Sequence, residues 1–270
     1  MTAAASAVPW PTVLVDGVAI HAATVTGCAA HVAAQSAAGR GGWIITANLD
    51  HLRRAAGDPQ YRRWLTEADI VTADGMPLLW AARLAGRPLP ERVAGSDLVP
   101  VLAAEAARTG RSVALLGGDP GTADAAAAGL SASHPGLRVV GTHCPPFGFE
   151  SSPDEMRRVE RFVDRAAADI VLVGLGSPRQ ERLIAGLRAR RPSAWWIGVG
   201  ITFSFLCGRV PRAPGWMRVA GLEWLHRLVQ EPRRLARRYL ADGLPYAAGL
   251  LARAAAGRRS RPTHPSTDLI

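Results

Sequence analysis

Apolar residues occur along the chain in short unbroken runs, and each run is followed by a longer segment with helical spacing. The clearest run covers residues 170–173, contains no polar residue, and ends in Gly174-Leu175-Gly176. A strand that is apolar at every position is typical of a parallel sheet covered on both faces. We therefore predict that this run is a central strand of an α/β domain.

Five other short, mainly apolar segments are also predicted to be strands, and helical segments separate them. They cover residues 43–45, 69–73, 112–116, 137–140 and 194–197. Residues 12–21 instead contain two apolar runs joined by Asp16-Gly17, the pattern of a β-hairpin. The alternation predicts an α/β fold: a three-layer, Rossmann-like, parallel-rich sheet with helices on both faces, an N-terminal β-hairpin and a helical C-terminal appendage.

Polar residues and glycines follow the predicted strands at the point where each strand ends. Because parallel strands end at one edge of the sheet, and ligands bind there, these residues should line one crevice at that carboxyl edge. They are Thr46, Asn48, Asp74, Gly117, Gly174, Gln180 and Gly200. Asn48 could also be no more than the cap of the helix that follows it.

The loop after residues 170–173 has the composition of a phosphate-binding turn. Gly174 and Gly176 allow a sharp turn and a close approach of ligand, Ser177 can cap the next helix, and Pro178 suits its first turn. Helix N-termini attract phosphates. The third glycine of a dinucleotide fingerprint would fall on Arg179, so a ligand-binding loop and a plain strand-to-helix turn both remain open.

The composition is that of a globular protein, since 48% of the 270 residues are hydrophobic and 20% are charged. There is no lysine, so arginine supplies the whole net charge of +10. From Gly208 onward 12 arginines face four acidic residues, which places most of the positive charge near the C-terminus. We divide the chain into an α/β domain (1–207), an arginine-rich helical appendage (208–256) and a disordered tail (257–270).

The appendage has the pattern of two amphipathic helices on either side of Pro232. The apolar stripe of the first helix consists of Leu222, Leu225, Leu228 and Val229. Such an arginine-rich segment can be a solvated face, a patch for a membrane surface or nucleic acid, or a clamp for phosphate groups. Trp216 and Trp224 favour the membrane surface, because indole rings prefer the lipid–water boundary.

Cysteine use and hydropathy restrict the cellular setting. Cys28, Cys144 and Cys207 share no C-x-x-C spacing, so the sequence predicts neither a disulfide framework nor a zinc site. The first ten residues lack the basic start and the long apolar core of a signal peptide. No window reaches the roughly 18 uncharged apolar residues that a membrane-spanning helix needs. We expect a cytoplasmic protein without a transmembrane helix.

A series of short motifs runs through the chain over about residues 12–240. The motifs are Thr46-Ala47-Asn48, Ala73-Asp74-Gly75-Met76, Ala94-Gly95-Ser96-Asp97, Leu116-Gly117-Gly118, Gly174-Leu175-Gly176-Ser177-Pro178-Arg179-Gln180-Glu181, Gly198-Val199-Gly200, Arg212-Ala213-Pro214, Leu222-Glu223-Trp224, Arg227-Leu228 and Glu231-Pro232-Arg233-Arg234. In this order the series resembles the WecG/TagA/CpsF glycosyltransferases. The resemblance implies transfer of a sugar from a UDP-sugar to a polyprenyl-diphosphate-linked saccharide in bacterial cell-surface polysaccharide synthesis, with inversion at the anomeric carbon.

The resemblance also narrows the substrates. In the TagA branch the sugar is N-acetylmannosamine and the acceptor is an undecaprenyl-diphosphate-linked N-acetylglucosamine, in the committed step of wall teichoic acid linkage. Other branches use an N-acetylmannosaminuronic acid or a glucose donor. The motifs do not distinguish these branches.

The resemblance further implies roles for single residues. The catalytic aspartate of the family falls on Asp74, which with Thr46 forms the expected catalytic pair. The expected substrate-binding residues are Asn48, Gly75, Gly117, Gly118, Gly174, Gly176, Pro178, Gln180, Glu181, Gly200, Arg227, Arg234 and Arg237. Family members usually have Phe-Asp after the Gly-Val-Gly run, whereas here Ser204 follows Phe203.

The chemistry of inverting glycosyl transfer agrees with these residue types. A base must take the proton of the acceptor hydroxyl, and the departing diphosphate must be neutralised. A carboxylate can be the base, and arginines of the appendage can bind phosphate bidentately. No Asp-x-Asp metal pair occurs in the chain, so we expect no cofactor and no metal.

Two other function classes remain for comparison. A nucleic-acid-binding protein would explain the arginines but not the polar strand ends, and basic and aromatic residues do not interleave. A soluble nucleotide-sugar-modifying enzyme without a lipid acceptor would explain the crevice but not the basic amphipathic appendage. The expected partners are therefore the UDP-sugar, the lipid-linked saccharide and the anionic inner face of the cell membrane, with no nucleic acid and a possible homo-oligomer.

Overall fold

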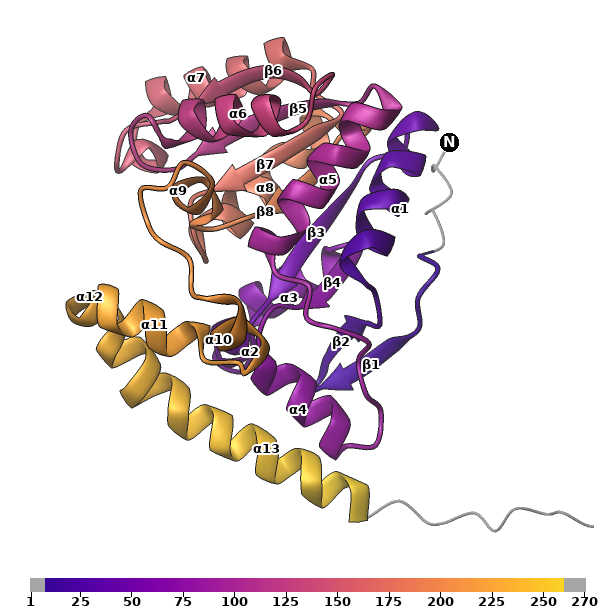
Figure 1. Cartoon of the computed structure of the whole chain (residues 1–270), viewed down its shortest axis with the longest axis vertical. Coiled ribbons are helices and arrows are strands. Elements are labelled where there is room, and N and C mark those ends of the chain that lie inside the picture. Colours follow the sequence, from indigo (N-terminus) through magenta and orange to yellow (C-terminus); the bar gives the residue numbers. More distant parts are fainter. Residues whose placement is uncertain (1–7, 260–270) are drawn as a thin grey trace, which may run out of the picture.

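Six parallel strands form the central sheet of the molecule (Figure 1). The structure is a computed structural model, and it describes residues 8–259. The strands are β3 (Gly42–Ala47), β4 (Ile70–Ala73), β5 (Ser112–Gly117), β6 (Arg138–His143), β7 (Ile170–Gly174) and β8 (Trp195–Gly198). Their order across the sheet is β4-β3-β8-β7-β5-β6, and every neighbouring pair is parallel. The predicted α/β class and the six predicted strands are confirmed.

Helices cover both faces of the sheet, which makes three layers. The helices of one face are α1 (Val25–Ala37), α5 (Gly95–Thr109), α6 (Thr122–Ser133) and α9 (Thr202–Leu206). Those of the other face are α2 (Leu49–Gly57), α3 (Pro59–Glu67), α4 (Met76–Leu84), α7 (Pro153–Ala166) and α8 (Arg179–Leu187). Trp195 and Trp196 pack into opposite cores, because successive side chains of a strand point to opposite faces.

The N-terminal hairpin is present as predicted. Strands β1 (Thr12–Val15) and β2 (Val18–His21) pair antiparallel, and Asp16 and Gly17 make the turn between them with positive φ angles of 51° and 78°. The amide of Val71 in β4 donates a hydrogen bond of 3.0 Å to Nδ1 of His21. This bond fixes the hairpin beside the edge strand of the main sheet.

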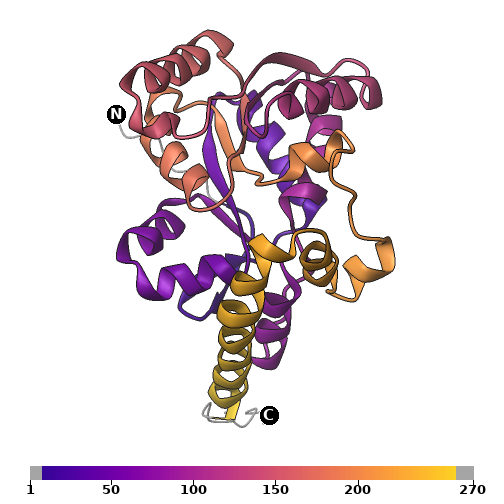
Figure 2. The same ribbon diagram turned by 90° about the vertical axis from the view of Figure 1, so that its left-hand side faces the viewer.

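The appendage consists of short helices followed by a long one. They are α10 (Gly215–Val219), α11 (Glu223–Gln230), α12 (Pro232–Ala236), the π-helical turn Arg237–Gly243 and α13 (Leu244–Arg259). Pro232 separates α11 from α12 as expected. Helix α13 runs beside α4 and away from the sheet (Figure 2).

The end of the chain differs from the sequence expectation. Helix α13 continues through residues 257–259, where the disordered tail was expected to begin. The alanine-rich stretch before Gly257 favours this continuation, since alanine is the best helix former. Residues 260–270 lie outside the described residues. Within residues 8–259 we find no helix with the length and hydrophobicity that crossing a bilayer requires.

Candidate active site

The carboxyl ends of the strands meet at one edge, as the sequence predicted. Backbone hydrogen bonds continue past the strands and join neighbouring ends. The amide of Asp74 donates to Ala47 O at 2.7 Å, that of Gly118 to Gly174 O at 2.7 Å, and that of Val199 to Val173 O at 2.9 Å. The polar strand ends are therefore held side by side along the carboxyl edge.

Thr46 and Asn48 end β3 and differ in their surroundings. Thr46 is buried on the face of the sheet that Ile44 shares, beneath α1 and α5. Asn48 caps α2, because its Oδ1 accepts from the amides of Asp50 and His51 at 3.0 and 3.4 Å. The cap is confirmed. It uses the amide oxygen, so the Nδ2 group of Asn48 could still donate to a ligand.

A buried polar chain links three of the strand ends. His51 Nδ1 lies 2.9 Å from Asn48 Oδ1, and His51 Nε2 lies 3.5 Å from Glu181 Oε1. Gln180 donates to the same Glu181 oxygen at 2.9 Å and accepts from the amide of Gly200 at 3.0 Å. Burial raises the pKa of Glu181, but His51 and Gln180 outweigh it, so the pKa lies below its ordinary value. An ionised Glu181 thus holds the ends of β3 and β8 against α8.

The glycines at the strand ends fall into two groups. At Gly174 an added Cβ would lie 2.7 Å from the ring of Phe203, and at Gly117 it would lie 2.9 Å from Leu175. These glycines are required by packing. Gly176 and Gly200 have positive φ angles and open space around the position of a Cβ. Their absent side chains leave room beside the carboxyl edge.

The structure corrects the expected role of Ser177. Helix α8 begins after Pro178, which is its N-cap and makes no side-chain capping bond. The hydroxyl of Ser177 instead shares a hydrogen bond of 2.6 Å with the hydroxyl of Tyr61. The loop is therefore fastened to α3, an element for which we had no prediction.

Asp74 is the candidate catalytic residue at this edge of the sheet. Its carboxylate is about one quarter exposed and lies 3.8 Å from Nη1 of Arg92. Burial raises the pKa of Asp74 to about 6; Arg92 and His51 oppose this rise, and Glu223 and Asp97 reinforce it. A partly exposed carboxylate with a pKa near neutrality suits a general base.

Several arginines of the appendage form ion pairs with acidic residues of the α/β domain. Arg212 and Arg218 pair with Asp97 at 2.6 and 3.5 Å, and Arg238 pairs with Asp50 at 3.1 Å. Arg227 and Arg234 instead pair with Glu231 inside the appendage, and Arg237 is exposed. Arg238 is thereby linked to the Asn48 cap, because the amide of its partner Asp50 donates to Asn48 Oδ1.

The sequence did not predict a role for four residues of this edge. They are His51, Arg92, Glu223 and Arg238. Only His51 had a local signal, because it stands three residues after Asn48, the spacing of a capping box. The others become visible only when distant segments are brought together.

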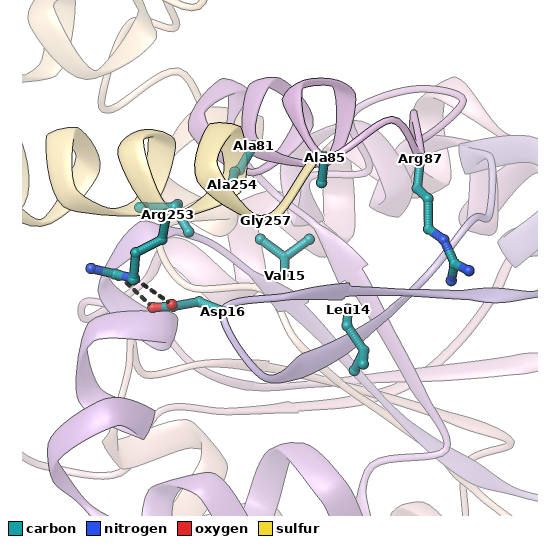
Figure 3. Close-up of a pocket in the computed structure, with 10 residues that line it drawn as sticks. Leu14, Val15, Asp16, Ala81, Ala85, Arg87, Arg253, Ala254 and Gly257 are labelled. Atoms are coloured by element: carbon teal, nitrogen blue, oxygen red, sulfur yellow. Dashed lines mark hydrogen bonds and ion pairs between the residues drawn. The ribbon is translucent and has the colours of Figure 1, made fainter. Parts of the chain in front are cut away.

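Two surface hollows are lined by other parts of the chain. One of about 310 Å³ lies between the hairpin, α4 and α13 (Figure 3), and one of about 470 Å³ lies between β6 and α7. Neither is lined by a residue of the predicted site. In the part of the chain that the structure describes, no group of three or more His, Cys, Asp or Glu side chains is arranged to hold a metal ion.

The chain matches a known protein family over most of its length. The model of the family described as "Glycosyl transferase WecG/TagA/CpsF family" matches residues 13–261. The match begins in the hairpin and extends past α13. The appendage is thus part of the matched unit, together with the sheet.

Proposed function

Because the chain belongs to the WecG/TagA/CpsF family of glycosyltransferases, which act in cell-surface polysaccharide synthesis, we propose that it transfers a hexose from a UDP-sugar to a polyprenyl-diphosphate-linked saccharide. N-acetylmannosamine is the first donor sugar to test. The observation that carries the proposal is Asp74, a partly exposed carboxylate of raised pKa at the edge where the strands end.

Asp74 is the general base of the proposed reaction. Its carboxylate takes the proton from the acceptor hydroxyl, while the hydroxyl oxygen bonds to the anomeric carbon. The bond from that carbon to the UDP oxygen breaks, and its electron pair leaves with UDP. A single displacement of this kind inverts the anomeric configuration. With a pKa of about 6, Asp74 is mostly ionised at neutral pH and is a stronger base than an ordinary carboxylate.

Arginines neutralise the departing diphosphate in this proposal, with no metal ion. Arg227, Arg234 and Arg237 are the candidates by family resemblance, and Arg238 is a fourth because it already reaches Asp50. A guanidinium binds phosphate through two parallel hydrogen bonds. The open backbone at Gly176 and Gly200 would receive the nucleotide.

The appendage also provides the proposed contact with the inner face of the membrane. Trp216, Val219 and Val229 expose 67%, 82% and 75% of their surface, and arginines surround them in the sequence. Exposed indole and aliphatic groups enter the lipid–water boundary, and arginines bind anionic headgroups.

The test is a transfer assay with a panel of UDP-sugars and a lipid-linked acceptor, run on the parent protein and on Asp74→Asn. Release of UDP that depends on both substrates and on Asp74 supports the proposal. Turnover of a UDP-sugar without any acceptor dependence, combined with no flotation on anionic liposomes, would favour the nucleotide-sugar-modifying enzyme instead.

A further inference from the structure

We propose that Glu223 of α11 is a positioning residue for the base: by binding Arg92, it keeps that arginine from closing on Asp74. This inference rests on the proposed function. It assigns to an acidic residue of the appendage a role in setting the state of the catalytic aspartate.

Three carboxylates compete for one guanidinium. Nη1 of Arg92 donates to Glu223 at 2.8 Å, and Nη2 donates to Asp97 at 2.6 Å. Asp74 lies 3.8 Å from Nη1, beyond hydrogen-bond distance. The same nitrogen therefore faces both Asp74 and Glu223, and it is Glu223 that receives the hydrogen bond.

Arg92 is anchored beside Asp74 whatever the appendage does. The next residue, Val93, donates its amide to Ala73 O at 2.9 Å and accepts from Thr72 Oγ1 at 3.2 Å. These bonds fix the backbone of Arg92 next to the end of β4. The neighbouring carboxylates therefore determine only the direction in which the Arg92 side chain points.

Glu223, by contrast, is brought in by the appendage. It lies 3.6 Å from Nε of Arg212, whose Nη2 donates to Asp97 at 2.6 Å, and Arg218 lies 3.5 Å from Asp97. When the appendage leaves, Glu223, Arg212 and Arg218 leave together. Arg92 then keeps Asp97 and can turn its free Nη1 to Asp74.

Charge decides what this change does to the base. The charged groups that face Asp74 are Arg92 from the loop before α5, Asp97 of α5, Glu223 of α11 and His51 of α2. Loss of Glu223 removes a negative neighbour and brings Arg92 closer, and both effects lower the pKa of Asp74. A carboxylate of lower pKa, held in an ion pair, is the weaker base.

The experiment compares Glu223→Gln with the parent as full-length protein on liposomes, measuring kcat/KM for transfer between pH 5 and 8.5. The acidic limb should move down by about one pH unit, and the plateau should fall several-fold. Glu223→Asp should restore part of both. The matched control is Asp242→Asn, which removes one negative charge from the appendage beside Arg53 rather than Arg92. Its acidic limb should stay in place.

Direct titration of the Asp74 carboxyl by carbon NMR separates this inference from the proposed function. A lower pKa of Asp74 in Glu223→Gln than in the parent supports the inference even if no tested UDP-sugar is turned over. An unmoved Asp74 titration in a folded Glu223→Gln protein would overturn it. An equal shift in Asp242→Asn would do the same, because the effect would then be one of net charge.

Discussion

Arg253 of α13 donates two hydrogen bonds to the carboxylate of Asp16, although 237 positions separate the two residues in the chain (Figure 3). Both bonds measure 2.9 Å, and the hydroxyl of Tyr246 donates to the same carboxylate. Burial raises the pKa of Asp16, but these partners outweigh it and hold the pKa below its ordinary value. The hairpin and the last helix are thereby fastened together.

Arg253→Ala should destabilise the protein by about 1 kcal/mol at pH 7, the upper range for a partly exposed ion pair. Because the folded-state pKa of Asp16 is lowered, its stabilisation is present above the unfolded value of 3.8 and is lost as pH falls through the folded value. Urea unfolding at pH 7 and near pH 3 measures this. A loss of equal size at both pH values would contradict the ion-pair explanation.

Asp74→Asn should fold like the parent and lose transfer activity by about 10²–10⁴-fold, the contribution of a positioned base. An amide keeps the shape of the side chain but cannot take the proton. Steady-state kinetics together with circular dichroism tests this. Near-full turnover in a folded variant would leave Asp74 as a binding residue and make Thr46 the next candidate.

The same substitution should stabilise the protein at neutral pH. The pKa of Asp74 is about 6 in the folded protein and 3.8 in the unfolded chain. The charged carboxylate therefore lowers the free energy of unfolding, by an amount that grows as pH rises from 3.8 to 6 and is constant at higher pH. Asn carries no charge and avoids this cost. We expect the Tm of Asp74→Asn to exceed that of the parent by several degrees at pH 7.5, and to equal it near pH 3.5.

Gly174→Ala should destabilise the protein by about 1–3 kcal/mol, because its Cβ would press on the buried ring of Phe203 at 2.7 Å. The matched control is Gly186→Ala in α8, where the Cβ meets nothing within 4 Å. That change should stabilise by up to about 1 kcal/mol through helix propensity. Denaturant midpoints of the two variants should therefore move in opposite directions.

Transfer activity should persist in EDTA, since arginines are the groups proposed to neutralise the diphosphate. The measurement is UDP release with and without the chelator, followed by addition of magnesium or manganese. Activity that disappears on chelation and returns with either ion would overturn the metal-independent proposal.

The sequence predicted the parts of the fold that depend on local patterns of apolar and turn-forming residues. The apolar run of residues 170–173 indicated a buried strand, and Asp16-Gly17 indicated the hairpin turn. The shared carboxyl edge followed from the parallel topology. Helix α3 was missed although Asp58 caps it, Pro59 opens it, and Tyr61 and Trp64 face the core at helical spacing.

The parts that sequence did not predict depend on distant pairs. Ser177 had a suitable position for capping, but Tyr61, 116 residues away, takes its hydroxyl. The hydrogen bond from Arg92 to Glu223 joins residues that are 131 positions apart, and no local sequence pattern indicates it. Gly174 was expected to admit a ligand, whereas the ring of Phe203 fills that space.

The strand order has a consequence for how the chain folds during synthesis. Of the strands in residues 8–259, β8 is made last, and it lies between β3 and β7 near the middle of the sheet. Until residues 195–198 leave the ribosome, β3 with β4 and β7 with β5 and β6 can form only two separate small sheets. Each exposes an unpaired, mainly apolar edge strand, which is a template for aggregation. Nascent chains that stop before β8 should therefore depend on chaperones, and completion of β8 should release them.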